Sequence, residues 1–132
     1  MAQRPVASGL LLCEQAIIEE RTRNVSLVNC FNRRTVERFP SERFPFVVFA
    51  LLTDGLGEIP LEVVIQRLDT LDEIYFRTVS FRFASPLQEV QFLLRVRDCS
   101  FPVSGAYQVA LLVESEPLAQ RRIQILHKEN SA

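Results

Sequence analysis

The side chains that enzymes most often use for proton transfer or nucleophilic attack are scarce in this sequence. The only histidine, His127, lies in a polar stretch after the last apolar run, so histidine chemistry would depend on a chain end that is expected to fray. A Cys-His pair meets the same difficulty. Cys13, Cys30 and Cys99 fall within or at the ends of apolar runs, where small buried hydrophobes are expected. We therefore expect no catalytic residues, no cofactor and no enzymatic activity.

Metal binding has one candidate set of ligands. Zinc is unsupported, because a lone histidine and three widely spaced cysteines lack the paired spacing of a zinc site. If the connections between successive strands alternate between two ends of the domain, four acids gather at one end: Asp69, Asp72, Glu73 and Asp98. Hard oxygen ligands in that number could hold Ca²⁺, although no D-x-D-x-D spacing is present. A Ca²⁺ or small-ligand-binding β-sandwich that uses the acidic loops around 69–73 and 98 is thus the alternative functional hypothesis.

The least ordinary stretch is the connection at residues 33–45, RRTVERFPSERFP, which repeats Glu-Arg-Phe-Pro. Arginine and aromatic side chains are enriched at binding hot spots, because they combine a large apolar area with directional hydrogen bonding. This loop therefore predicts a non-enzymatic protein-interaction or assembly module. The candidate partner-binding residues are Arg33, Arg34, Arg38, Phe39, Arg43 and Phe44. In the competing structural interpretation, the two phenylalanines cap the end of the domain and the arginines pair with Glu37 and Glu42.

The elements that must position these residues are β-strands. Alternation of apolar and polar residues recurs along the chain, with turn signals every ten to fifteen residues and no sustained helical period. The expected strands are Ser8–Glu20, Val25–Asn32, Phe46–Thr53, Ile59–Leu68, Tyr75–Phe83, Glu89–Arg97, Gly105–Glu114 and Leu118–Leu126. Asp54-Gly55 between two apolar runs predicts a hairpin. Eight short strands with Pro or Gly turns indicate an all-β, single-domain sandwich of mostly antiparallel strands, with an ordered core at about 6–127 and a polar tail at 128–132.

Tyr107 favours an immunoglobulin-like sandwich. It lies just where a strand begins after a Pro-containing connection, which is the setting of a tyrosine corner, and Val109 takes the position at which antibody domains carry their second cysteine. An ordinary core tyrosine near a strand start would give the same pattern. In either case the expected role of Tyr107 is structural.

Loose strand patterns at both ends of the chain carry a family resemblance. Near the start, Leu12-Cys13-Glu14 precedes a hairpin and a Ser26-Leu27-Val28-Asn29 strand; near the end, the pattern runs from Phe101-Pro102 through Gly105–Val113 to Leu118–Ile125. About half of the chain thereby resembles an uncharacterised bacterial family of small immunoglobulin-like cytosolic β-sandwiches. The resemblance implies the fold and carries over no activity.

Composition limits the partners and the compartment. The net charge of −1 supplies no long-range attraction for nucleic acid or an anionic bilayer, and no apolar run reaches the roughly 20 residues that span a membrane. An odd number of scattered cysteines fits a reducing interior, so we expect a cytoplasmic protein. SGLLLCEQ at 8–15 is similar to a lipoprotein signal, but Leu12 stands where a small residue is needed, so a first strand is expected.

Partner binding through a sheet edge is a further hypothesis. Exposed strand edges accept a strand from another chain unless charge or proline protects them. Strand Tyr75–Phe83 carries Arg77 and Arg82, and the last strand carries Arg121 and Arg122, whereas Leu10–Ile18 has little such protection. A homodimer formed through this first strand is therefore a hypothesis.

Overall fold

The computed structural model describes residues 2–130, which form one domain without an α-helix. The strands are β1 (Val6–Ile18), β2 (Val25–Cys30), β3 (Arg33–Val36), β4 (Phe46–Thr53), β5 (Gly57–Arg67), β6 (Glu73–Phe83), β7 (Val90–Val96), β8 (Gly105–Val113) and β9 (Glu116–His127), followed by a 3₁₀ turn, η1 (Lys128–Asn130). The all-β prediction is confirmed. All eight expected strands are present, and β3 is an additional strand inside the predicted loop 33–45. Residues 131–132 of the predicted tail lie outside the described residues.

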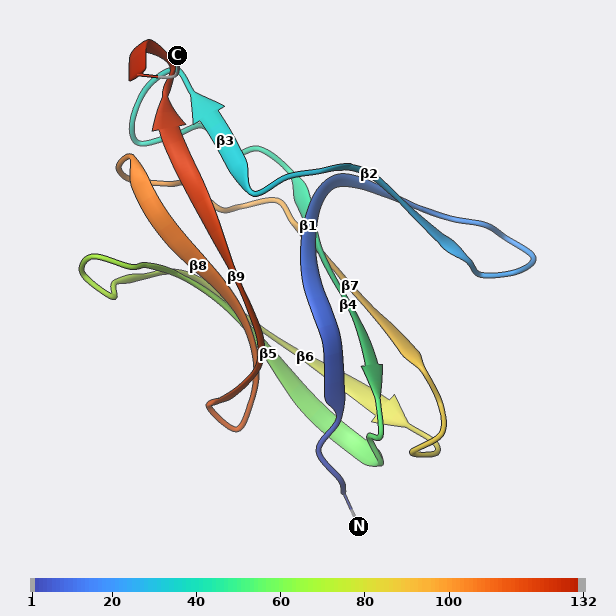
Figure 1. The fold of residues 1–132 in the computed structure, drawn as a ribbon. Coiled ribbons are helices and arrows are strands. Elements are labelled where there is room, and N and C mark those ends of the chain that lie inside the picture. The colour runs from blue at the N-terminus through green and yellow to red at the C-terminus, as the bar shows by residue number, and fades with distance from the viewer. Residues whose placement is uncertain (1, 131–132) are drawn as a thin grey trace.

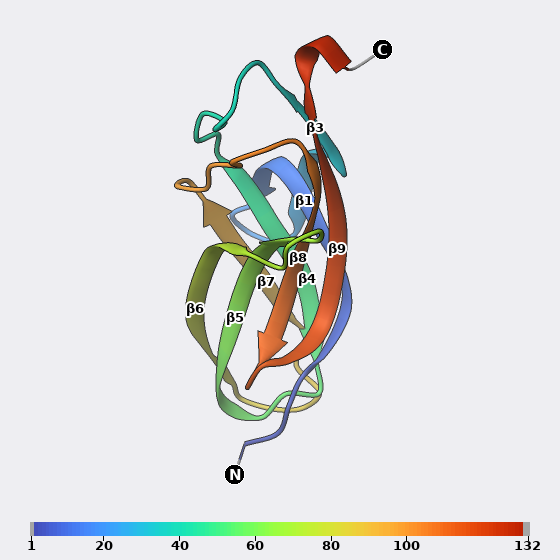
Figure 2. The same cartoon turned by 90° about the vertical axis from the view of Figure 1, so that its left-hand side faces the viewer.

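The strands form two sheets that face each other (Figures 1 and 2). One sheet has the order β2-β1-β4-β7, and the other has the order β3-β9-β8-β5-β6. Each neighbouring pair is antiparallel except β3 and β9, which are parallel. The mostly antiparallel sandwich is therefore as predicted, and the parallel pair is the exception at one edge.

The core lies between the sheets because alternate side chains of each strand point inward. Leu12 of β1 and Phe92 of β7 meet Leu61 of β5 and Leu111 of β8 in one continuous apolar cluster. In β6, Tyr75 and Phe83 are buried while the intervening polar side chains face solvent, as the sequence alternation indicates. Among the described residues, no helix has the length and hydrophobicity needed to span a bilayer.

The predicted hairpin at Asp54-Gly55 is wrong, because β4 and β5 belong to different sheets. The turn carries the chain across the sandwich instead, and Asp54 N–H donates to the carbonyl of Pro86, 2.9 Å away, in the β6–β7 connection. Gly55 is required here by packing: a Cβ at this position would lie 2.7 Å from the Phe83 ring. An Asp-Gly signal specifies that the chain reverses, but it does not specify which strand lies alongside.

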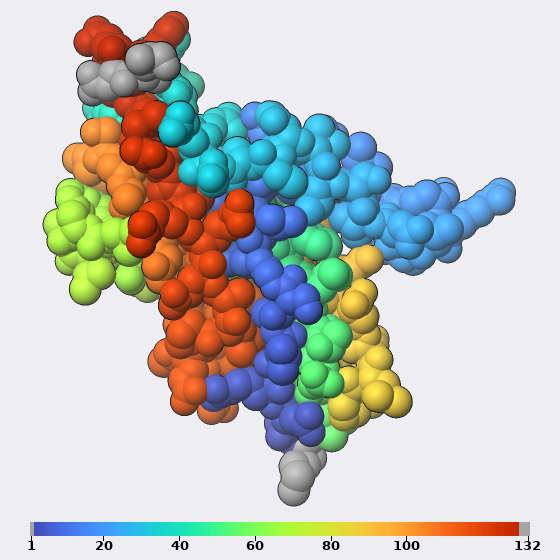
Figure 3. Space-filling view, viewed as in Figure 1, coloured from blue at the N-terminus to red at the C-terminus, as the bar shows by residue number. Residues whose placement is uncertain are grey.

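The first strand is not a sheet edge. β1 pairs with β2 on one side and with β4 on the other. β4 pairs with Leu10–Cys13, and β2 pairs with residues from Cys13 to Ile18. Leu10–Ile18 is therefore not the open sheet edge that the sequence predicted, and a homodimer through an edge strand stays a prediction. The edges are β2 and β7 in one sheet and β3 and β6 in the other. The β1–β2 hairpin projects from the body of the molecule, as the light-blue arm in Figure 3 shows.

Candidate functional site

The Arg/Phe-rich segment 33–45 begins with a strand at the rim of the second sheet. β3 lies parallel to the C-terminal end of β9, with Arg33 opposite Gln124 and Val36 opposite His127. The pairing starts where Gln124 N–H donates to the carbonyl of Asn32, at 2.9 Å. Residues 37–45 then form an arch that leads back to β4 in the other sheet (Figure 2). The segment thus connects the two sheets at one end of the sandwich.

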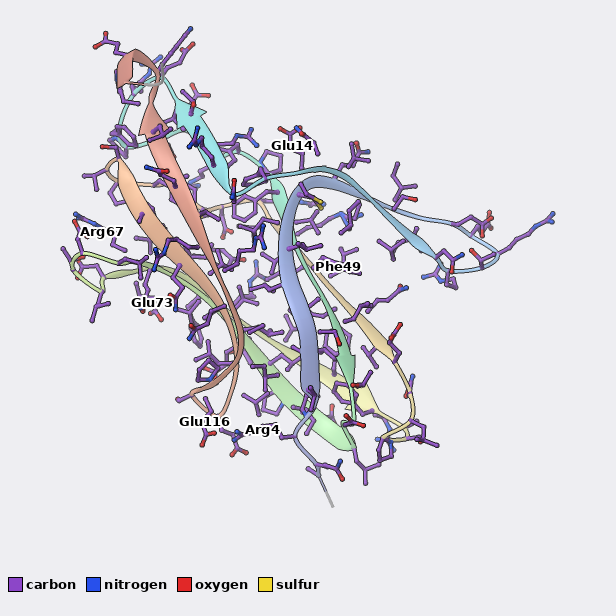
Figure 4. The ribbon with its side chains drawn as sticks, viewed as in Figure 1. Arg4, Glu14, Phe49, Arg67, Glu73 and Glu116 are labelled. Atoms are coloured by element: carbon purple, nitrogen blue, oxygen red, sulfur yellow. The ribbon has the colours of Figure 1, made fainter. Side chains whose placement is uncertain are left out.

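Arg34 holds this end together through apolar and charged contacts. Its guanidinium carbon lies 4.2 Å from the centre of the Phe44 ring and 5.5 Å from that of Phe31. One guanidinium nitrogen lies 3.2 Å from Oε1 of Glu14, which Figure 4 labels near the bend of β1. The guanidinium thus makes cation–π contacts with the two rings and an ion pair with the carboxylate. We therefore assign Arg34 mainly a structural role.

Phe39 and Phe44 are half-buried and pack against the core, as in the capping interpretation. The Phe44 ring stacks on Phe101 with 5.7 Å between centroids, and the Phe39 ring lies 6.0 Å from that of His127. The charged partners differ from that interpretation: Arg34 pairs with Glu14, and Glu37 lies 3.4 Å from Lys128 Nζ. His127 is accordingly packed against a ring rather than solvated in a tail.

Ser41 fixes the arch to the body of the domain, although sequence analysis did not single it out. Apart from the tyrosines and cysteines, it is the one buried polar side chain among the described residues, at 5% exposure. Its Oγ accepts from Phe101 N–H at 2.9 Å, its own N–H donates to the Phe101 carbonyl at 2.9 Å, and Ser100 Oγ donates to its carbonyl at 2.6 Å. These bonds fix the backbone between the two Phe-Pro repeats.

A pocket of about 210 Å³ lies along β3 and the start of the arch. Its walls are Arg34, Thr35, Val36, Glu37, Arg38, Glu42 and Phe44. Side chains of successive strand residues point to opposite faces, so a pocket lined by the three strand residues Arg34, Thr35 and Val36 must follow the side of the strand. The pocket therefore runs beside the β3 backbone rather than over one face of the sheet.

The outward side of β3 has free backbone groups. The Asn32 carbonyl points to β9, and the direction of the backbone N–H and C=O groups alternates from residue to residue. The backbone groups of Arg34 and Val36 therefore point to β9, and those of Arg33 and Thr35 point away from it. Within residues 2–130, no strand pairs with β3 on that outward side. The edge thus presents the N–H and C=O of Arg33 and Thr35 to solvent.

Three of the predicted arginines in segment 33–45 are exposed: Arg33, Arg38 and Arg43. In the part of the chain that the structure describes, none of the three forms an ion pair with an acidic side chain. Charged groups in this state keep their full hydration and are available to a ligand. The predicted set therefore divides into packing residues, Arg34, Phe39 and Phe44, and these exposed cations.

The four acids of the calcium hypothesis are not assembled into a ligand set. Asp69 is engaged by Arg67 through two bonds, of 3.1 and 2.8 Å, and this pairing holds the pKa of the Asp69 carboxyl below its usual value. Arg67, the last residue of β5, and Glu73, the first residue of β6, are labelled in Figure 4 on either side of the loop that joins these strands. No three His, Cys, Asp or Glu side chains of residues 2–130, Asp72 and Asp98 included, come together as metal ligands.

Tyr107 and Cys99 lie inside the core near this end. The Tyr107 hydroxyl donates to the Val103 carbonyl at 2.6 Å, four residues upstream, which is the hydrogen bond of a tyrosine corner. Cys99 is fully buried, and burial together with the charge of Asp98 raises its pKa to about 12. A thiol in this state is protonated at neutral pH, so it is not a nucleophile.

Comparison with known proteins gives a family without an assigned activity. No curated protein matches the chain. A model of the family described as "Family of unknown function (DUF6941)" matches residues 8–126. This agrees with the expectation of an uncharacterised family. Because the match covers most of the chain, the protein belongs to this family of unknown function.

Proposed function

We propose that this domain is a non-enzymatic interaction module that binds an extended, acidic segment of a partner protein along β3. The observation that carries the proposal is the unpaired outward edge of β3 with a pocket along it. A peptide strand placed there would exchange backbone hydrogen bonds with Arg33 and Thr35, which is the β-augmentation mode of recognition. Side chains of that peptide would enter the pocket between Val36 and Phe44.

The charge of the site supports an acidic ligand. Residues 33–45 contain four arginines and two glutamates, and two of these charges are already paired, Arg34 with Glu14 and Glu37 with Lys128. The exposed side chains of Arg33, Arg38 and Arg43 leave a local excess of positive charge in a chain whose net charge is −1. Carboxylates of a bound strand would meet these cations, which favours both association rate and specificity.

The test removes one of the two outward N–H donors of β3, that of Thr35. Thr35→Pro removes this N–H and leaves that of Arg33, and an edge strand tolerates proline where its N–H faces solvent. Peptides are first selected from a displayed random library on the full-length protein, and their affinities are then measured by fluorescence anisotropy. We expect acidic peptides, an affinity loss of about tenfold or more with Thr35→Pro, and little change with Thr35→Val, which keeps the donor.

A charge test separates the site from general electrostatic attraction. Arg33→Glu with Arg38→Glu should weaken the same peptides, whereas Arg21→Glu with Arg23→Glu, an equal change in the loop between β1 and β2, should not. Ligands that are insensitive to both Thr35→Pro and the first pair would refute the proposal. An oligonucleotide that binds through Arg33 and Arg38, with no effect of Thr35→Pro, would replace the peptide by a nucleic acid.

We further propose that the domain is an immunoglobulin-like bacterial protein that works in the cytoplasm. The hydrogen bond between Tyr107 and Val103 supports the fold type. Three free cysteines, two of them buried, support a reducing compartment. Localisation of a tagged chain in its host, with fractionation of the cell, tests the compartment.

A further inference from the structure

Two of the three cysteines lie directly opposite each other on neighbouring strands. Cys13 of β1 is the register partner of Cys30 of β2. The next residues along, Leu12 and Phe31, are joined by a hydrogen bond from Phe31 N–H to the Leu12 carbonyl, at 2.9 Å. Since hydrogen-bonded and non-hydrogen-bonded pairs alternate in an antiparallel ladder, Cys13 and Cys30 form a non-hydrogen-bonded pair. Both side chains are therefore on the same face of the sheet, at the closer of the two spacings.

That spacing is compatible with a covalent bond between the sulfurs. Opposed residues in a non-hydrogen-bonded pair have Cα atoms about 4.5 Å apart and Cβ atoms about 4.5–5.5 Å apart. A disulfide needs Cα atoms about 4.4–6.8 Å apart and Cβ atoms about 3.5–4.5 Å apart. Closure thus requires an approach of about 1 Å. β2 can make this approach because it is an edge strand, paired only with β1.

The two thiols differ in accessibility, which gives them different chemical roles. Cys30 is exposed, whereas Cys13 has no exposed surface and packs with Ala16 and Val47. Burial is the main cause that raises the pKa of Cys13, and the Cys30 thiol adds to it; the backbone N–H of Val28 on β2 acts in the opposite direction. An oxidant therefore reaches Cys30 first, and Cys13 is within reach of the product.

We propose that Cys13 and Cys30 are a redox pair that a small-molecule disulfide, such as oxidised glutathione, converts into a cross-strand disulfide. The Cys30 thiolate attacks one sulfur of the oxidant, so that a mixed disulfide forms and one glutathione thiolate leaves. Cys13, after losing its proton to water, attacks the Cys30 sulfur and displaces the second glutathione. The protein dithiol loses two electrons and two protons, and the oxidant is reduced to two thiols.

The test uses the full-length reduced protein in a series of glutathione buffers, followed by blocking of free thiols with N-ethylmaleimide and intact mass measurement. We expect a species that has lost two hydrogens and carries one blocked thiol after denaturation. Trypsin cleaves after Arg21 and Arg23, so the proposed bond would join two separate peptides, residues 1–21 and 24–33. A linked pair of these peptides supports the proposal.

Matched variants distinguish the two roles. In Cys13→Ala the reaction should stop at the mixed disulfide, with glutathione retained on Cys30. In Cys30→Ala the first step, reaction of the exposed thiol with oxidised glutathione, should be lost. Cys99→Ala, which removes the thiol buried in the main core, should close at the wild-type rate. Stable glutathione on Cys30 in the wild-type protein, or oxidation that continues in Cys30→Ala at the same rate, would overturn the proposal.

Discussion

Tyr107→Phe removes one oxygen atom from the core and tests whether the tyrosine corner stabilises the domain. The Tyr107 hydroxyl donates to the Val103 carbonyl at 2.6 Å and lies 3.3 Å from the Val103 N–H. The tyrosine itself has no exposed surface, and its ring meets Phe101 edge-on with 4.9 Å between centroids. Phenylalanine keeps this packing and leaves both backbone groups of Val103 without the hydroxyl.

The expected cost follows from those two groups. A part-buried carbonyl that loses its hydrogen-bond donor destabilises a protein by about 1–3 kcal/mol. For a domain of this size, each kcal/mol corresponds to roughly 3–5 °C in the melting temperature, so we expect a decrease of about 3–15 °C. Urea denaturation followed by circular dichroism gives the free energy of unfolding, and calorimetry gives the melting temperature.

The other tyrosine of the chain is a matched control. Tyr75 is buried, and its hydroxyl has no hydrogen-bond partner of normal geometry among the described residues. Tyr75→Phe removes a buried oxygen that forms no hydrogen bond of normal geometry and should leave the stability unchanged or raise it. If Tyr107→Phe is as stable as the wild type, or if both variants lose equal stability, the role assigned to the corner is refuted.

Three further variants test the packing of the domain. Ser41→Ala leaves the Phe101 N–H without its side-chain acceptor and should cost about 1–3 kcal/mol in urea denaturation, with faster hydrogen exchange at Phe101; unchanged exchange would show that Ser41 does not hold the arch. Gly55→Ala places a Cβ 2.7 Å from the Phe83 ring and should lower the free energy of unfolding by about 1–3 kcal/mol, and a stable variant would show that the turn can shift. The Cys99 pKa is raised from 9.0 to about 12, so the folded state retains the proton and stability should fall as pH rises through this range; denaturation of Cys99→Ala should show a smaller alkaline loss.

Sequence alternation was enough to predict eight of the nine strands and their inward faces. The period-2 pattern of Tyr75–Phe83 and of the stretch around Phe92 reports directly which side chains avoid water. β3 was missed because Arg33–Val36 has little apolar character, and its strand conformation depends on backbone bonds to β9, about ninety residues later. A local pattern contains no information about such a partner.

The candidate site was predicted in part. The Arg/Phe-rich composition of 33–45 identified the segment, but not the division between Arg34, which packs on Phe44, and Arg38, which is exposed. Neither Glu14 nor Ser41 could be identified from the sequence. Glu14 is a single acid in an apolar strand, and Ser41 is a serine in a loop, directly after Pro40. Their importance depends entirely on the groups that they meet.

What the sequence determined by itself is the class of fold, because the alternation of apolar residues fixes strands and requires two faces to be buried together. Only the tertiary structure decided which strands are neighbours: the turn at Asp54 crosses between sheets, β3 lies on β9, and Cys13 faces Cys30. The physical reason is that such pairings are selected by the free energy of the whole core and backbone network, to which no local stretch contributes enough to choose its own partner.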